Sequence, residues 1–167
     1  EKRDKTLSYR RAEWLADRPR GTTLESCLRD AHNALKTVEE RTVIRDSGQC
    51  IRSAKKLAPR DGGIFIHLIA DTPGEEASVI PKMKRGIEEV DVGTASPPDD
   101  SEFMDGDAFL YVRDDHVFLC STGLRDGAIR VFLYEFFSKA KLGKHATKFD
   151  LLKVPKLDKL KMLRTQS

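Results

Sequence analysis

The sequence predicts an α+β domain, in which an antiparallel sheet of hairpins is packed by two or three amphipathic helices. Residues 108–121 form two apolar segments around a two-residue turn, and residues 64–70 are a run rich in β-branched residues. Residues 23–40 and 126–142 repeat apolar side chains at helical spacing. At 167 residues the chain is long enough for one compact domain with a core of its own.

Charge is distributed unevenly along the chain, although the net charge is only +3. Residues 138–167 carry nine Lys and Arg against two acids, and residues 1–20 carry seven against four. The middle, residues 21–137, has 14 Lys and Arg against 21 acids. This asymmetry favours an anionic partner for the basic ends or copies that meet head to tail, and an ordinary solvated surface explains it equally well.

Composition also argues against a membrane-spanning or secreted protein. Apolar runs such as Gly62–Ala70 are too short to span a bilayer, and no stretch has the pattern of a signal peptide. Cys27, Cys50 and Cys120 are scattered singly with no CxxC pair, which predicts free thiols in a reducing, cytoplasmic compartment. The chain begins at Glu1 and stops within a helical pattern, which fits either a fragment or a trimmed form of a longer protein.

We expect a basic N-terminal segment over residues 1–21, a core domain over 22–142 and a basic C-terminal segment over 143–167. The first helix is predicted at residues 23–40. Thr22 and Glu25 have the spacing of a capping box at its start, in which each side chain binds the backbone N–H of the other.

Two hairpins are predicted before the centre of the chain. One spans residues 41–53, with a turn that ends at Gly48. The other spans residues 64–80, with a strand buried on both faces, a type II turn over Thr72–Glu75 and a returning strand at Ala77–Ile80. His67 lies on one face of this strand, and we interpret it as a core residue.

Residues 82–106 give the weakest pattern. Ile87–Val92 fits either a short strand or a helical turn. Ser96–Glu102 contains two prolines and three acids, so it fits a solvated loop or a carboxylate-rich metal site. The loop is favoured because the ligand spacing of an EF-hand is absent.

The third hairpin has a register fixed by its two-residue turn, so that Arg113 opposes His116. One face of the hairpin then carries Phe109, Tyr111, Phe118 and Cys120, and the other carries Leu110, Val112, Val117 and Leu119. Since both faces are apolar, we expect both to be covered. Asp126 is the predicted N-cap of the helix that follows, and Gly143 is its predicted end.

The C-terminal segment is rich in lysine. Phe149–Leu152 fits a short strand, and Pro155 could begin a last amphipathic helix. Lysine side chains at this density can neutralise phosphates without reading sequence. The candidate nucleic-acid-binding residues are Lys139, Lys141, Lys144, Lys153, Lys156, Lys159, Lys161 and Arg164.

Signatures of catalysis are not recognisable in the sequence. There is no phosphate-binding glycine loop, no HExxH, no GxSxG and no zinc-deaminase pattern. His116 and Cys120 would share a strand face but lie too far apart for a catalytic dyad. We therefore predict no catalytic residue, no bound metal and no cofactor.

The segment FLYVRDDHVFLCSTGLRDGAIRVFL, preceded by GIFIHLIADTPGEEASVIP, resembles the phage-exclusion and abortive-infection proteins of Rex type. The resemblance covers roughly residues 62–141 and rests on apolar pattern and spacing. It implies a bacterial cytosolic defence component that binds nucleic acid and works with a partner protein. No binding residue of that family maps onto a position in this chain.

Three functions follow as hypotheses. The first is a non-catalytic nucleic-acid-binding or sensing component of an anti-phage defence system. The second is an assembly subunit that docks on an acidic partner protein or on another copy of itself. The third is a metal-dependent nuclease that uses Asp99, Asp100, Glu102, Asp105 or Asp107.

Overall fold

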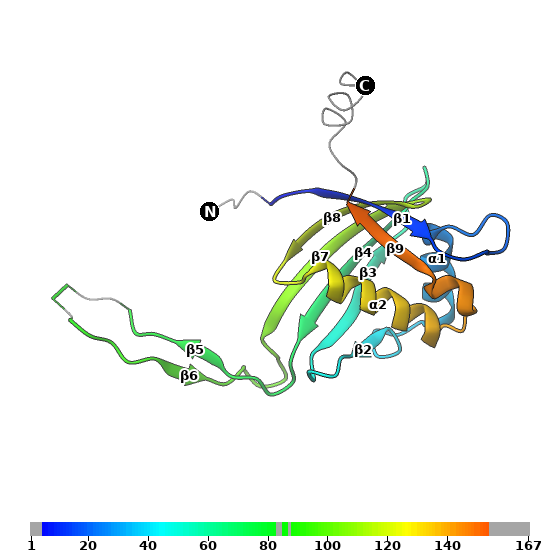
Figure 1. Ribbon diagram of the computed structural model, residues 1–167. Coiled ribbons are helices and arrows are strands. Elements are labelled where there is room, and N and C mark those ends of the chain that lie inside the picture. Colours follow the sequence, from blue (N-terminus) through cyan, green and yellow to red (C-terminus); the bar gives the residue numbers. More distant parts are fainter. Residues whose placement is uncertain (1–4, 83–84, 87, 154–167) are drawn as a thin grey trace, which may run out of the picture.

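A computed structural model describes residues 5–82, 85–86 and 88–153, and it confirms an α+β fold based on an antiparallel sheet. Seven strands in the order β2-β3-β4-β7-β8-β1-β9 curl into half a barrel around the helices (Figure 1). The strands of this sheet are β1 (Ser8–Trp14), β2 (Thr42–Ile44), β3 (Cys50–Leu57), β4 (Ile64–Asp71), β7 (Met104–Arg113), β8 (His116–Thr122) and β9 (Phe149–Lys153). The helices are α1 (Leu24–Ala34), α2 (Asp126–Lys139) and the 3-10 turn η1 (Lys144–Thr147).

Two of the three expected hairpins are confirmed. β2 pairs with β3, and β7 pairs with β8 in the predicted register, with Arg113 opposite His116 and Phe109 opposite Cys120. The prediction of a middle hairpin at residues 64–80 is wrong, because β4 pairs with β3 on one side and with β7 on the other. The predicted turn at Thr72–Glu75 is present, with the Glu75 N–H bound to the Thr72 carbonyl at 3.1 Å, but it does not return the chain to the sheet.

The chain after this turn forms a projecting ribbon, which we call the arm (residues 72–103). Its two strands, β5 (Ala77–Val79) and β6 (Gly93–Ala95), pair only with each other. Figure 1 shows the arm extending away from the seven-stranded sheet, beyond the ends of the strands that it joins. The solvated loop expected at residues 96–102 lies in the returning half of the arm, and its residues are exposed apart from the partly buried Pro97.

The two ends of the described chain complete the sheet. β1 lies between β8 and β9, with Tyr9 opposite Phe118 and Trp14 opposite Phe149. The strand expected at Phe149–Leu152 is confirmed as β9. β1 was not predicted, since its alternating residues include Arg10, Arg11 and Glu13 and give no apolar period. The last helix expected after Pro155 lies outside the described residues.

Both helices differ at their ends from the prediction. The N-cap of α1 is Thr23 rather than Thr22, and its partner in the capping box is Ser26 rather than Glu25. The helix ends at Ala34 rather than near residue 40, because Leu35 takes an extended backbone conformation. The Arg41 guanidinium then binds the carbonyls of Leu35 and Lys36 just past this end.

In α2 the N-cap is Arg125, whose side chain makes no capping bond. Asp126, the predicted N-cap, is instead the first residue of the helix. Its carboxylate accepts a hydrogen bond from Arg10 Nε at 2.9 Å, so this acid ties the helix to β1. The helix ends at Lys139, a few residues before Gly143.

The core lies between the helices and one face of the sheet, which we call the inner face. Its largest fully buried side chains come from α2 and from the central strands, and include Phe132, Phe136, Phe137, Ile64, Ile66, Leu68 and Leu110. Burying each such side chain contributes about 2 kcal/mol to the free energy of unfolding. Among the described residues, no helix is long and apolar enough to cross a membrane.

Candidate nucleic-acid interface

The opposite, outer face of the sheet carries aromatic rings that are partly exposed. Strand alternation places Phe109 outward and its neighbour Leu110 inward; Phe109 is 39% exposed and Leu110 is 0% exposed. Phe65 is 43% exposed and Phe118 is 39% exposed. The expectation that both faces of the central hairpin, and of the strand at residues 64–70, are covered is therefore wrong.

We call the outward rings the ring layer. They come from four strands that are adjacent in the sheet, β4, β7, β8 and β1, and comprise Tyr9, Phe65, His67, Phe109, Tyr111, His116 and Phe118. Their centroids lie 5.0 Å apart for Phe65 and Tyr111, 6.3 Å for Tyr111 and Phe118, and 5.4 Å for Phe118 and Tyr9. Tyr9 also stacks on His116 at 5.9 Å. Five rings thus form a continuous row across the sheet.

The other two rings of the layer form a close stack. His67 lies parallel to Phe109, with 4.0 Å between centroids and 2° between planes. Its Nε2 lies 3.0 Å from Oδ2 of Asp107, which fixes the orientation of the imidazole. His67, which we expected in the core, is therefore a partly exposed residue of the outer face.

One glycine allows the row to reach the end of the sheet. Gly63 has a φ of +79°, and a Cβ atom at this position would lie 2.4 Å from the hydroxyl oxygen of Tyr111. The Tyr111 ring therefore lies directly against the backbone before β4. A side chain at residue 63 would both strain the backbone and displace this ring.

Basic side chains surround the ring layer. Strand alternation places Arg11, Lys55 and Arg113 on the outer face, and the ammonium group of Lys5 lies 5.4 Å from the centroid of Phe109. Lys55 also lines a hollow of about 580 Å³ on this face, together with Leu57, Phe65, His67 and Phe109. The nearby acids Asp71 and Asp107 are engaged by Arg52 and His67.

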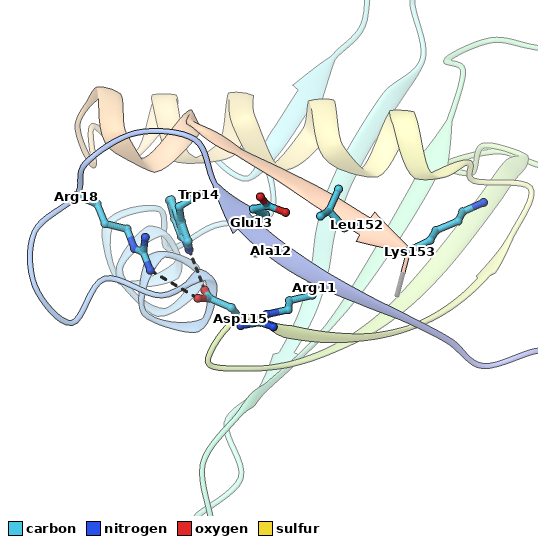
Figure 2. Close-up of a pocket in the computed structure, with 8 residues that line it drawn as sticks. All are labelled: Arg11, Ala12, Glu13, Trp14, Arg18, Asp115, Leu152 and Lys153. Carbon is cyan, nitrogen blue, oxygen red and sulfur yellow. Dashed lines mark hydrogen bonds and ion pairs between the residues drawn. The ribbon is translucent and has the colours of Figure 1, made fainter. Parts of the chain in front are cut away.

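A second, polar groove lies where β1 meets β9 and the β7–β8 turn (Figure 2). It has a volume of about 480 Å³ and is lined by Arg11, Ala12, Glu13, Trp14, Arg18, Asp115, Leu152 and Lys153. Asp115 accepts a hydrogen bond from Trp14 Nε1 at 3.1 Å, and the Arg18 guanidinium lies 4.7 Å from the centroid of the Trp14 ring. Arg11 belongs both to this groove and to the border of the ring layer, so the two surfaces are continuous.

The turn at Asp114 and Asp115 also holds the start of α1. Asp115 Oδ1 accepts the Leu24 N–H at 2.9 Å, and Glu25 Oε2 accepts the Asp114 N–H at 2.8 Å. Although burial alone would raise the pKa of Glu25, hydrogen bonds from Asp114, Arg29 and Gly63 hold it below its ordinary value. These contacts explain why Glu25 does not form the predicted capping box, and they make the turn a rigid border of the site.

The four nominated lysines that the structure describes do not lie in one patch. Lys139, Lys141 and Lys144 lie around the end of α2, and Lys139 donates to the Thr42 carbonyl at 2.7 Å. Lys153 is the last residue of β9, opposite Arg10 of β1, and it lines the groove together with Arg11. The remaining four, Lys156, Lys159, Lys161 and Arg164, lie outside the described residues.

The acids of the nuclease hypothesis are also dispersed. Asp99, Asp100 and Glu102 lie on the arm, whereas Asp105 accepts hydrogen bonds from Gln49 and Thr72 at its base. In the part of the chain that is described, no group of three or more His, Cys, Asp and Glu residues is placed to hold a metal ion. We therefore do not propose a nuclease.

The cysteines differ in their burial and in where they lie relative to the sheet. Cys27 is buried in the core, and this burial raises the pKa of its thiol to about 11. Cys120 is partly exposed on the outer face, opposite Phe109. Most of the groups that the outer face offers to a ligand are rings and cations.

Comparison of the chain with protein-family models, curated proteins and solved structures gives no match.

Proposed function

We propose that this chain is a non-catalytic module that binds single-stranded nucleic acid on its ring layer. The observation that carries the proposal is the half-exposed row of rings on a face that the described chain leaves open. Each nucleobase has a π-face, so aromatic side chains can stack on it whatever its identity, with about 1–3 kcal/mol per base. Binding of this kind needs no catalytic residue and no base-specific hydrogen bond.

The cations around the layer support the same ligand. A strand whose bases lie on the rings would carry its phosphates along the border, within reach of Arg11, Lys55 and Arg113. Neutralising phosphates releases counterions, so affinity should fall steeply as salt rises. A duplex hides the faces of its bases in the helical stack, which makes a single strand the better ligand for a flat aromatic surface.

The lysine-rich C-terminal segment extends this proposal. Lys153 and Arg11 both line the groove shown in Figure 2, at the β1 end of the ring layer. Lys156, Lys159, Lys161 and Arg164 follow Lys153 closely in sequence. We propose that they add phosphate contacts beyond this end, while Lys139, Lys141 and Lys144 contribute only long-range attraction from the helix layer.

The test measures the affinity of the full chain for a fluorescently labelled oligothymidylate. Fluorescence anisotropy reports the binding at several salt concentrations. Phe109→Ala and Phe118→Ala should each weaken binding by about fivefold to 150-fold, the equivalent of losing one stacked base. Lys55→Ala and Arg113→Ala should each reduce the slope of log affinity against log salt by about 1. Val131→Ala removes an exposed apolar side chain from α2 and is the matched control, with unchanged binding expected.

Two results would overturn the proposal. One is the lack of any binding at low salt. The other is full binding by the Phe109→Ala, Phe118→Ala double variant together with loss of binding after Lys156→Glu and Lys159→Glu, since the lysine segment alone would then account for the affinity.

We further propose that the module acts in anti-phage defence alongside a partner protein, as the resemblance of residues 62–141 to Rex-type proteins implies. Phage should form fewer plaques on bacteria that produce the chain with the product of a neighbouring gene. Plaque counts should recover with the Phe109→Ala, Phe118→Ala variant at equal expression. Equal plaque counts with and without the chain would remove the defence role and leave the binding proposal intact.

A further inference from the structure

The arm is exposed along its whole described length. From Thr72 to Asp105 no described residue is buried, and only three residue pairs, from Ala77–Ala95 to Val79–Gly93, join its strands. An isolated two-stranded ribbon is at best marginally stable in water. The arm also presents apolar side chains to solvent, namely Val79, Ile80, Val90 and Val92. Packing against a second surface would stabilise such a ribbon.

The charge of the arm restricts which surfaces it can pack on. Residues 72–103 carry eight acids against three Lys and Arg. A ribbon that wraps nucleic acid has the opposite charge, because it must neutralise phosphates. The partner of the arm should therefore be basic, with apolar area between its charges.

The outer face of the sheet has both properties. Phe65, Phe109 and Phe118 are each more than a third exposed, and Lys5, Arg11, Lys55 and Arg113 surround them. The arm cannot reach this face in its own chain in the arrangement observed. It continues outward from the ends of β4 and β7, where Asp71 pairs with Met104, and points away from the sheet (Figure 1).

We infer that the arm of one copy lies on the ring layer of a second copy. A two-fold axis would make the contact reciprocal, so that each acidic arm covers the basic face of the other chain. The contact does not depend on nucleic acid. It does place the arm on the surface proposed for single-stranded nucleic acid, so that self-association and nucleic-acid binding compete.

The mass of the full chain in sedimentation equilibrium tests the inference, measured over a range of protein and salt concentrations. At low salt the chain should sediment as a dimer, and salt should weaken the dimer. Replacing residues 72–103 by Asn-Gly between Asp71 and Met104, which already face each other, should give a monomer.

A second variant covers the case in which the shortened chain fails to fold. Glu88→Gln, Glu89→Gln and Asp91→Asn together keep the arm but remove three of its exposed charges, and should raise the dimer dissociation constant about tenfold or more. The matched control is Asp17→Asn, Glu39→Gln and Glu135→Gln, three exposed acids outside the arm, with dimerisation unchanged.

The outcomes separate this inference from the proposed function. Addition of oligothymidylate should dissociate the dimer, and the shortened chain should bind oligothymidylate more tightly than the full chain. A full chain that stays monomeric at every concentration overturns the inference, even if it binds the oligonucleotide. So does equal dimerisation by the arm triple variant. A dimer that depends on the arm but binds no oligonucleotide would overturn only the proposed function.

Discussion

The two faces of one sheet differ in the kind of apolar residue that they carry. On the inner face, β4 and β7 place Ile64, Ile66, Leu68, Leu110 and Val112, which are aliphatic and fully buried. On the outer face the alternating positions of these strands hold Phe65, His67, Phe109 and Tyr111, which are aromatic and partly exposed. Aliphatic side chains fill a core, whereas rings combine apolar area with flat faces open to a ligand. Two apolar faces therefore do not imply two covered faces.

The largest expected effect is the difference in stability between removing a ring from the core and removing a ring from the outer face. Phe136→Ala, in the core, should lower the free energy of unfolding by about 3–5 kcal/mol because it leaves a cavity. Phe118→Ala, on the outer face, should lower it by less than about 1 kcal/mol, the scale of cross-strand pairs. Denaturant unfolding measures both. Similar losses for the two variants would mean that the outer ring is structural, and would break the contrast between the faces.

Histidines provide the next contrast. His32 is buried beneath the inner face, with Nδ1 donating to the Leu28 carbonyl at 2.8 Å, so that Nε2 accepts from the Ser53 hydroxyl at 2.7 Å. Desolvation lowers the pKa of His32 to about 4 from an ordinary value of 6.5. The nearby cations Arg41 and Lys56 act in the same direction.

The sign of the pH effect follows from this depressed pKa. Between pH 6.5 and about 4 the unfolded chain binds a proton at His32 that the folded chain does not, so stability falls as pH falls. The loss should approach about 3 kcal/mol at the lower limit. This loss can be measured from the midpoints of denaturant unfolding across this pH range. The midpoints of the natural chain are compared with those of the His32→Gln variant. Replacing the outer histidines, His67→Gln or His116→Gln, should leave the pH dependence in place; if either abolished it, His32 would not be the residue responsible.

The smallest expected effect lies within the ring layer itself. Tyr111 and Phe118 face each other across β7 and β8, with their centroids 6.3 Å apart. A double-mutant cycle to Ala should give a coupling in unfolding free energy of about 0.2–1 kcal/mol. A coupling several times larger would show that the rings are held for folding rather than left available to a ligand.

The sequence predicted the local features of the fold because they depend on neighbouring residues. The register of β7 and β8 follows from the turn at Asp114 and Asp115, and α2 follows from its apolar spacing. The pairing of β4 with β7 was missed because about thirty residues of the arm separate the two strands. A pattern of apolar residues cannot show which of two distant strands a given strand will join.

The candidate site was missed for a related reason. Three residues of the ring layer, Phe109, Tyr111 and Phe118, were recognised as one face of a hairpin, but apolar character alone assigned them to the core. A signal was present: the outward positions hold rings and histidine beside Arg113, while the inward positions hold only aliphatic residues. Tyr9 and Arg11 could not have been added, since β1 has no apolar period and joins the face only through its pairing with β8.

The most direct test of the central claim is to find where a bound base lies. A single-stranded oligonucleotide that carries 5-iodouracil can be cross-linked to the full chain by ultraviolet light, and the modified peptides identified by mass spectrometry. Stacking on the ring layer predicts cross-links at Phe65, Phe109 and Phe118, which disappear when an excess of unlabelled oligothymidylate is present. Cross-links confined to the lysine-rich residues after Lys153, with none on the outer face, would contradict it.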